Sequence, residues 1–315
     1  MKKWLLLSVA VLCLFFACVY VLIPSTIEIS DAVSARTTRD GTFRMLMSEN
    51  EWAKWWGYAL PERNDSEISR EIFNYRDYKY NLIKPGFNSA VVSIQHDNNT
   101  INATITLLQL SIDSIVMLCQ CSLDATANPF RKIGRYAAAV DLKKNMEAVL
   151  ESLKAFVEKD DNIYGLHISE GHAQDTLLIT TKRIFTREPG VSDVYAMIDD
   201  LRKYAAENKC RQTNPPMLNI LHEGAKYRVM VAIPIDKEIA TQGPISFVKM
   251  TNGNFMITQV QGGPGTVQNA LQQMQLYFDD YDKTSMAITF QYLVTDRIKE
   301  PDTTKWVTKI FAPVM

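Results

Sequence analysis

The chain opens with an unbroken apolar run, and this run is the strongest hydrophobic feature of the sequence. It covers residues 4–23 and follows Lys2 and Lys3. A helix of this length crosses a hydrocarbon core about 30 Å thick, and positive charges before it place the N-terminus in the cytoplasm. The pattern predicts a transmembrane anchor over residues 1–24. The rest of the chain would then lie outside the cytoplasm, on the periplasmic side in a bacterial cell.

A second interpretation of this segment stays open. Residues 15–18 read Phe-Phe-Ala-Cys and approximate a bacterial lipobox, in which Cys18 would be lipidated after cleavage. Phenylalanine three positions before the cysteine is unusual, and further apolar residues follow it. The length of the run favours a retained helix over a cleaved signal. Both interpretations place the protein on a membrane.

Residues 25–159 alternate between strand-like and helix-like patterns. An alternating segment at 26–30 predicts an opening strand, and a helical pattern then leads into the cluster Trp52, Trp55 and Trp56. Three further strands are predicted at 89–95, 100–109 and 114–123. A long helical pattern over 133–158 carries one apolar stripe, which needs a sheet to cover it. These residues therefore predict one α+β domain.

An internal repeat dominates the chain after a polar segment at 160–165, which predicts a linker. Each copy follows the order strand, helix, strand, strand, over 176–235 and 247–314. Ile179 and Ile257 occupy the strand centres, and Pro234 and Pro313 stand near the ends of the closing strands. The pattern predicts a duplicated α+β domain over 160–315, with a cleft where the two sheets meet.

Charge and cysteine content narrow the function classes. Lysine plus arginine (34) nearly balances aspartate plus glutamate (35), so no net positive field favours nucleic acid, and no helix-turn-helix pattern is present. The five cysteines form no C-x-x-C motif, and only four histidines exist. We therefore expect no metal site, no cofactor and no nucleic-acid partner, while a protein partner stays unknown.

Two segments of the first domain carry a family resemblance: N-E-W-A-K-W-W and, before the last helix, N-P-F-R-K-I. With the opening strand they resemble the START-like (SRPBCC, polyketide-cyclase-like) superfamily over residues 25–159. The resemblance implies a helix-grip fold, in which a curved antiparallel sheet wraps the last helix around an apolar cavity. That superfamily hosts transport, binding and cyclase functions, so the fold alone selects none of them.

The second domain carries the segments V-A-I-P-I-D, F-M-I-T-Q-V-Q-G-G-P and T-K-I-F-A-P-V. It resembles the GyrI-like effector-binding domain of AraC-type and MerR-type regulators over about residues 177–315. The resemblance implies a drug- or metabolite-sized ligand in the cleft between the repeats, among aromatic residues. Many members carry a glutamate in the last strand where this chain has Lys309. The change reverses the charge and suits an anionic or carbonyl-bearing ligand, unless the amine reaches into solvent.

We expect the ligand to contact Lys309, Trp306, Tyr292, Phe255 and Tyr195, although each aromatic residue also suits a core. No residue is nominated as catalytic. The sequence thus predicts a membrane-anchored, non-catalytic small-molecule-binding protein. Two alternatives stay open: a weak GyrI-like hydrolase with a tyrosine beside a carboxylate, and a ligand-sensing module that acts on a membrane partner.

Overall fold

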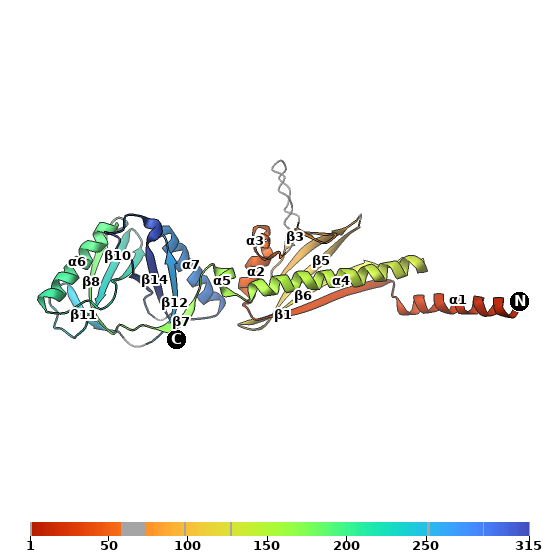
Figure 1. The fold of residues 1–315 in the computed structure, drawn as a ribbon, viewed down its shortest axis with the longest axis horizontal. Coiled ribbons are helices and arrows are strands. Elements are labelled where there is room, and N and C mark those ends of the chain that lie inside the picture. The colour runs from red at the N-terminus through yellow and green to blue at the C-terminus, as the bar shows by residue number, and fades with distance from the viewer. Residues whose placement is uncertain are drawn as a thin grey trace, which may run out of the picture. The chain divides into compact units, whose positions relative to one another are not determined.

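The computed structural model describes residues 2–57, 73–97, 99–126, 128–250, 253–285 and 287–314. The chain divides into two compact units, Met1–Lys159 and Asp160–Met315. Each unit combines helices with one antiparallel sheet (Figure 1). Seven α-helices and one short 3-10 helix lie in these described ranges. The predicted α+β class is confirmed.

The first unit is built on a six-stranded antiparallel sheet with the order β1-β6-β5-β4-β3-β2. Its strands are β1 (Thr26–Ala35), β2 (Phe73–Tyr75), β3 (Tyr78–Pro85), β4 (Ser89–His96), β5 (Asn99–Ser111) and β6 (Ser114–Asp124). Its helices are α1 (Lys2–Leu22), α2 (Arg39–Met47), α3 (Glu49–Trp55) and α4 (Pro129–Val157). Because β1 pairs with β6, the opening and closing strands of the sheet are neighbours.

Helix α4 lies along the six-stranded sheet (Figure 1). It begins four residues before the predicted start because Asn128 caps it: the Asn128 side chain accepts hydrogen bonds from the backbone N–H groups of Phe130 and Arg131. Proline at position 129 suits the first turn, where the missing N–H costs nothing. The C-terminal half of α4 buries its apolar side against the sheet, through residues such as Met146 and Leu150.

The space between α4 and the sheet is filled by side chains. A cavity of about 10 Å³ remains there, lined among others by Tyr80, Ile105 and Leu150. The Tyr80 hydroxyl donates a 2.6 Å hydrogen bond to Asn145, which satisfies both buried groups. A space this small holds at most one water molecule. The apolar cavity that the START-like resemblance implies is therefore closed in this structure.

The predicted transmembrane anchor is wrong. Among the residues that the structure describes, we find no helix with the length and apolar character needed to cross a membrane. The last turns of α1 take part in the packing of the first unit instead: the Phe16 ring meets Phe130 of α4 edge to face at 5.6 Å. The Lys132 amine also lies 5.0 Å from the centre of the Tyr20 ring, and Val19 is buried. The prediction that the chain lies outside the cytoplasm loses its basis with the anchor.

The second unit is built on an eight-stranded antiparallel sheet with the order β11-β8-β10-β9-β13-β14-β12-β7. Its strands are β7 (Ser169–His172), β8 (Leu177–Phe185), β9 (Met217–Glu223), β10 (Lys226–Pro234), β11 (Ile245–Lys249), β12 (Asn254–Gln261), β13 (Phe290–Leu293) and β14 (Val307–Val314). Its helices are α5 (Asp160–Tyr164), α6 (Val191–Glu207), α7 (Pro264–Asp280) and the 3-10 helix η1 (Thr303–Lys305).

The order strand, helix, strand, strand occurs twice in this unit, as β8-α6-β9-β10 and β12-α7-β13-β14. The two halves form one continuous sheet, because β9 pairs with β13 at Leu218–Gln291 and Met217–Tyr292. No junction of two sheets exists here, contrary to the prediction. Helix α6 packs on β8 and β10, and α7 packs on β12 and β14. The ladder registers place both helices on one face, and we call the opposite face the helix-free face.

The structural alignment of the two halves differs by one residue from the alignment predicted from the sequence, which matched Ile179 with Ile257. Leu178 pairs with Pro234, and Phe255 pairs with Pro313, so Leu178 is the structural equivalent of Phe255. Side chains alternate between the faces of a strand, and a shift of one residue therefore changes the face. Ile179 is fully buried beneath α6, whereas Ile257 packs with the cluster on the helix-free face.

The predicted linker forms helix α5. The Tyr164 hydroxyl donates a 2.6 Å hydrogen bond to buried Asp280, and the Tyr281 hydroxyl donates a 2.7 Å bond to Asp160 at the start of α5. Ile163 is buried as well. These contacts fix α5 against α7, so the polar sequence of the segment reflects side-chain hydrogen bonds and not an extended connection.

The tryptophan cluster of the first unit provides a stability prediction. Trp52 is 1% exposed, stacks on Trp56 at 5.9 Å and donates a 2.8 Å hydrogen bond to the Leu46 carbonyl. We expect Trp52→Ala to lower the free energy of unfolding by about 3–5 kcal/mol, because it leaves a large buried void. The control Tyr136→Ala, on the exposed side of α4, should change it by less than about 0.5 kcal/mol. Urea denaturation measures both, and equal losses would contradict the assignment of the core.

A second prediction concerns stability at high pH. Burial, followed by the charges of Asp160 and Glu170, raises the pKa of Tyr277 to about 12. Because the pKa of Tyr277 is higher in the folded state, its protonated phenol contributes to the free energy of unfolding. This contribution is complete below the unfolded pKa of about 10 and is lost as the pH rises through about 12. We expect the free energy of unfolding to fall over this range and Tyr277→Phe to reduce the fall. Identical pH profiles for the two proteins would contradict the prediction.

Candidate functional site

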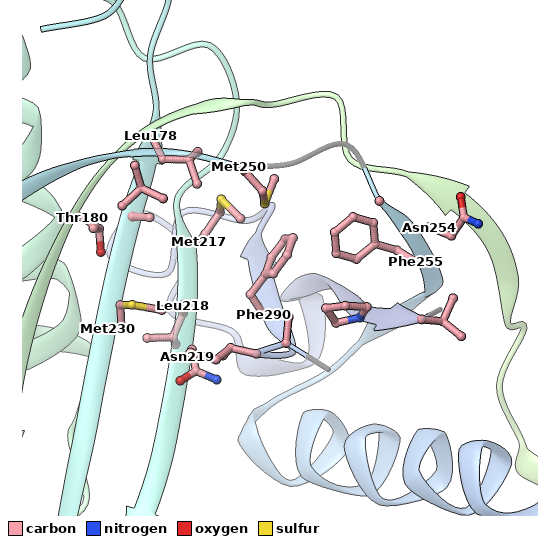
Figure 2. A pocket seen from close by; sticks show the side chains of 17 residues that line it. Leu178, Thr180, Met217, Leu218, Asn219, Met230, Met250, Asn254, Phe255 and Phe290 are labelled. Atoms are coloured by element: carbon pink, nitrogen blue, oxygen red, sulfur yellow. The ribbon is translucent and has the colours of Figure 1, made fainter. Parts of the chain in front are cut away.

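An apolar pocket of about 360 Å³ lies on the helix-free face. Its volume falls within the range of sites that hold small organic ligands. Figure 2 shows side chains from both halves of the sheet pointing toward one another across it. Large apolar side chains of its lining include Leu178, Met217, Met230, Met250, Phe255 and Phe290. Three of these six are methionines, whose flexible side chains adapt to ligands of different shape.

The pocket is shaped by differences between the two halves. The shared register makes Met217 equivalent to Phe290 and Ala232 equivalent to Phe311. The second half therefore has larger side chains on this face. The Phe290 and Phe311 rings stack nearly parallel, with centres 5.3 Å apart. Phe290 lines the apolar pocket and Phe311 lines a second pocket, so the stack lies at the boundary between the two.

The second pocket has a volume of about 490 Å³; its lining combines apolar residues with polar ones such as Gln259 and Lys309, and we call it the polar pocket. Asp175, in the connection before β8, is its central group. The Tyr292 hydroxyl donates a 2.6 Å hydrogen bond to Asp175 Oδ2, and the Asn214 amide donates a 2.7 Å bond to Oδ1. Burial, followed by the hydrogen bond and charge of Asp175, raises the pKa of Tyr292 above its ordinary value. Tyr292 is therefore a neutral phenol at physiological pH.

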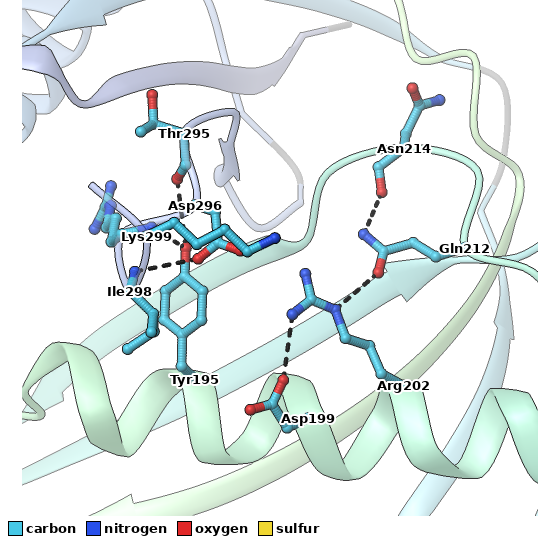
Figure 3. Close-up of polar contacts among 10 residues, drawn as sticks. Tyr195, Asp199, Arg202, Gln212, Asn214, Thr295, Asp296, Ile298 and Lys299 are labelled. Carbon is cyan, nitrogen blue, oxygen red and sulfur yellow. Dashed lines mark hydrogen bonds and ion pairs between the residues drawn. The ribbon is translucent and has the colours of Figure 1, made fainter.

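Hydrogen bonds connect α6 to Asn214, the residue that contacts Asp175, and Figure 3 shows the bonds from Arg202 to Gln212 and on to Asn214. Arg202 on α6 donates from Nε to the Gln212 side chain at 3.1 Å, and the Gln212 amide donates to the Asn214 carbonyl at 2.6 Å. The Asn214 side chain then reaches Asp175. These bonds link the loop before β9 to α6, and the loop brings the Asn214 amide to Asp175.

Three of the five predicted ligand contacts lie on the helix-free face. Phe255 lines the apolar pocket, and Tyr292 and Lys309 line the polar one. Lys309 stands between Tyr292 and Gln259 in the sheet. It is exposed, and within the described part of the chain its amine has no hydrogen bond or ion pair. Lys309 therefore faces the polar pocket while its amine remains accessible to solvent.

The other two predicted contacts, Tyr195 and Trp306, line neither pocket. The Tyr195 hydroxyl accepts a 2.7 Å hydrogen bond from the Arg297 backbone N–H (Figure 3). The Trp306 indole donates a 2.8 Å bond to the Glu300 carbonyl, and the Arg297 guanidinium lies 4.9 Å from its ring centre. Both aromatic residues fasten the β13–β14 connection, and a ligand contact for either stays a prediction.

Sequence reasoning missed Asp175, Asn214 and the three pocket methionines. Asp175 and Asn214 are separated by 39 positions and belong to no motif, so only the fold shows that they meet. The sequence contains a signal for one of the methionines, because Met217 is the first residue of a predicted strand. Within the described ranges, no group of three or more histidine, cysteine, aspartate or glutamate side chains is placed to hold a metal ion.

No protein-family model matches the chain, and no curated protein matches its sequence. Among solved structures, the C-terminal domain of EcmrR is 13% identical, with a TM-score of 0.42, over 48% of this chain and 98% of that one. SAV2435, solved bound to tetraphenylphosphonium, is 15% identical over 47% and 94%, with a TM-score of 0.33. A START superfamily protein from Mycobacterium smegmatis is 13% identical over 42% and 97%, with a TM-score of 0.30. Similarities this distant do not establish a family or a ligand for this chain.

The raised pKa of Tyr292 is testable by absorbance. A pH titration at 295 nm, compared between the protein and Tyr292→Phe, isolates the ionisation of this one phenol. We expect the difference to show no phenolate below pH 10, because burial and Asp175 disfavour the charged form. Tyr136, exposed on α4, provides the control variant Tyr136→Phe. Ionisation of Tyr292 near pH 9 would contradict the described Asp175–Tyr292 contact.

Proposed function

We propose that this chain is a small-molecule-binding protein whose ligand lies in the apolar pocket of the helix-free face, between the two halves of the duplicated unit. The observation that carries the proposal is the pocket itself: about 360 Å³, lined by apolar side chains from both repeats. Among the described residues of the first unit, the cavity between α4 and the sheet measures only about 10 Å³.

The size of the pocket sets the expected affinity. A ligand that buries roughly 300 Å² of apolar surface gains about 7 kcal/mol at 25 cal/mol per Å². The loss of translational and rotational freedom offsets part of this gain. Since 7 kcal/mol alone corresponds to a Kd near 10 µM, we expect dissociation constants of tens of micromolar or weaker for a simple apolar probe.

Binding of the neutral fluorescent probe N-phenyl-1-naphthylamine to the full chain tests the proposal. Val248 is half exposed and lines the pocket, so Val248→Asp should weaken binding about tenfold by placing a charge in the wall. The control Ile184→Asp changes an exposed apolar residue on β8 outside the pocket and should leave the affinity unchanged. Absence of binding, or equal affinities for the two variants, would contradict the site.

Hydrolysis is a second candidate function because one observation favours it: a carboxylate lies 2.6 Å from a tyrosine in the polar pocket. A nucleophilic or basic phenolate, however, needs a pKa near the operating pH. Asp175 and burial move the pKa of Tyr292 in the opposite direction. The arrangement therefore supports a hydrogen-bonded structural pair better than a catalytic one.

Ester hydrolysis distinguishes these two functions. We expect the chain to hydrolyse p-nitrophenyl acetate no faster than Tyr292→Phe does, within about twofold, because the phenol remains protonated. A rate that falls by two orders of magnitude or more in both Tyr292→Phe and Asp175→Asn would establish the hydrolase instead.

A further inference from the structure

The two pockets are neighbouring parts of one surface. Strands β12, β13 and β14 each line both pockets, with residues two positions apart. The residues in the apolar pocket are Phe255, Phe290 and Pro313, and their partners in the polar pocket are Ile257, Tyr292 and Phe311. Residues two apart in a strand share a face and lie about 7 Å from each other. One molecule of ordinary ligand size can therefore occupy both pockets.

Comparison of the two repeats shows that the polar pocket, the polar end of this surface, carries a lysine where the apolar pocket has an uncharged residue. Lys309 pairs with Tyr292, just as Met230 pairs with Asn219 in the first half. Lys309 is thus the structural equivalent of Met230, which lines the apolar pocket. The surface has an uncharged methionine at one end and an ammonium group at the equivalent place of the other end.

Asp175 also lines the polar pocket and its negative charge opposes that of Lys309, but its oxygens are already engaged within the protein whereas, among the described residues, the Lys309 amine is not. Both oxygens of Asp175 already accept hydrogen bonds, from Tyr292 and from Asn214 with Thr213. A cationic ligand would have to share these acceptors. The Lys309 ammonium has three donors and no partner among the described residues, and Gln259 beside it supplies a further amide to the same pocket.

We infer that the ligand is an amphipathic anion, with its apolar body in the apolar pocket and its carboxylate, sulfonate or other acidic group in the polar pocket beside Lys309. This inference rests on the proposed function and specifies the class of ligand. Lys309 is exposed, so solvent screens its charge and limits the gain to about fivefold in affinity. Lys309 sets the charge preference, while the apolar pocket supplies most of the affinity.

Two probes with the same apolar body test the inference on the full chain. N-phenyl-1-naphthylamine is neutral, and 1-anilinonaphthalene-8-sulfonate carries the same rings with one sulfonate. Fluorescence titration at low salt should give about fivefold tighter binding of the anion. Lys309→Met should remove this difference, because the affinity for the anion falls to that for the neutral probe. The control Lys226→Met removes an exposed lysine outside both pockets and should preserve the difference.

The outcomes separate this inference from the proposed function. Equal affinities for the two probes, or an advantage of the anion that persists in Lys309→Met, would overturn the inference while binding in the apolar pocket still stands. Failure of the neutral probe to bind, or binding insensitive to Val248→Asp, would overturn the proposed function as well. Loss of the anion's advantage in 0.5 M sodium chloride would support the electrostatic role of Lys309.

Discussion

The pairing of β9 with β13 is the constraint on which the candidate site depends. This short ladder joins the two halves of the second unit into one sheet. Because α6 and α7 cover the same face of that sheet, the opposite face receives apolar side chains from both halves without a helix to bury them. A surface of this kind, hollowed and apolar, is the usual form of a small-molecule site. Breaking the ladder would separate the walls of the pocket.

Both units pack helices against an antiparallel sheet, but they leave different amounts of space beside it. In the first unit, α4 lies against the six-stranded sheet, and its long side chains, with Tyr80 bonded to Asn145, leave almost no space. In the second unit, helices cover only one face of the sheet, and the Phe290 and Phe311 rings stack on each other on the helix-free face. Close packing stabilises both units, but only the second keeps a cavity large enough for an organic ligand among the described residues.

Periodicity predicted most of the elements, since alternation and helical stripes are direct consequences of burial on one face. The repeated order of strand, helix, strand and strand followed from such patterns. Three features escaped for physical reasons. The length of the apolar run at the N-terminus does not reveal that Phe16 packs on Phe130. The sequence repeat placed Ile179 and Ile257 at equivalent strand centres, although the ladder registers place them on opposite faces. Asp175, Asn214 and Tyr292 are far apart in the sequence and only the fold brings them together, so no local pattern predicts that Asp175 contacts the other two.

Methionine methyl NMR tests whether the helix-free face of the second unit binds a small molecule. The full chain labelled with ¹³C-methyl methionine is titrated with N-phenyl-1-naphthylamine. We expect shifts confined to the resonances of the pocket methionines, Met217, Met230 and Met250. The buried methionines of the first unit should remain unchanged; these are Met45, Met117 and Met146. Shifts confined to the first unit, or no shift in the pocket methionines at saturating probe, would contradict binding at this face.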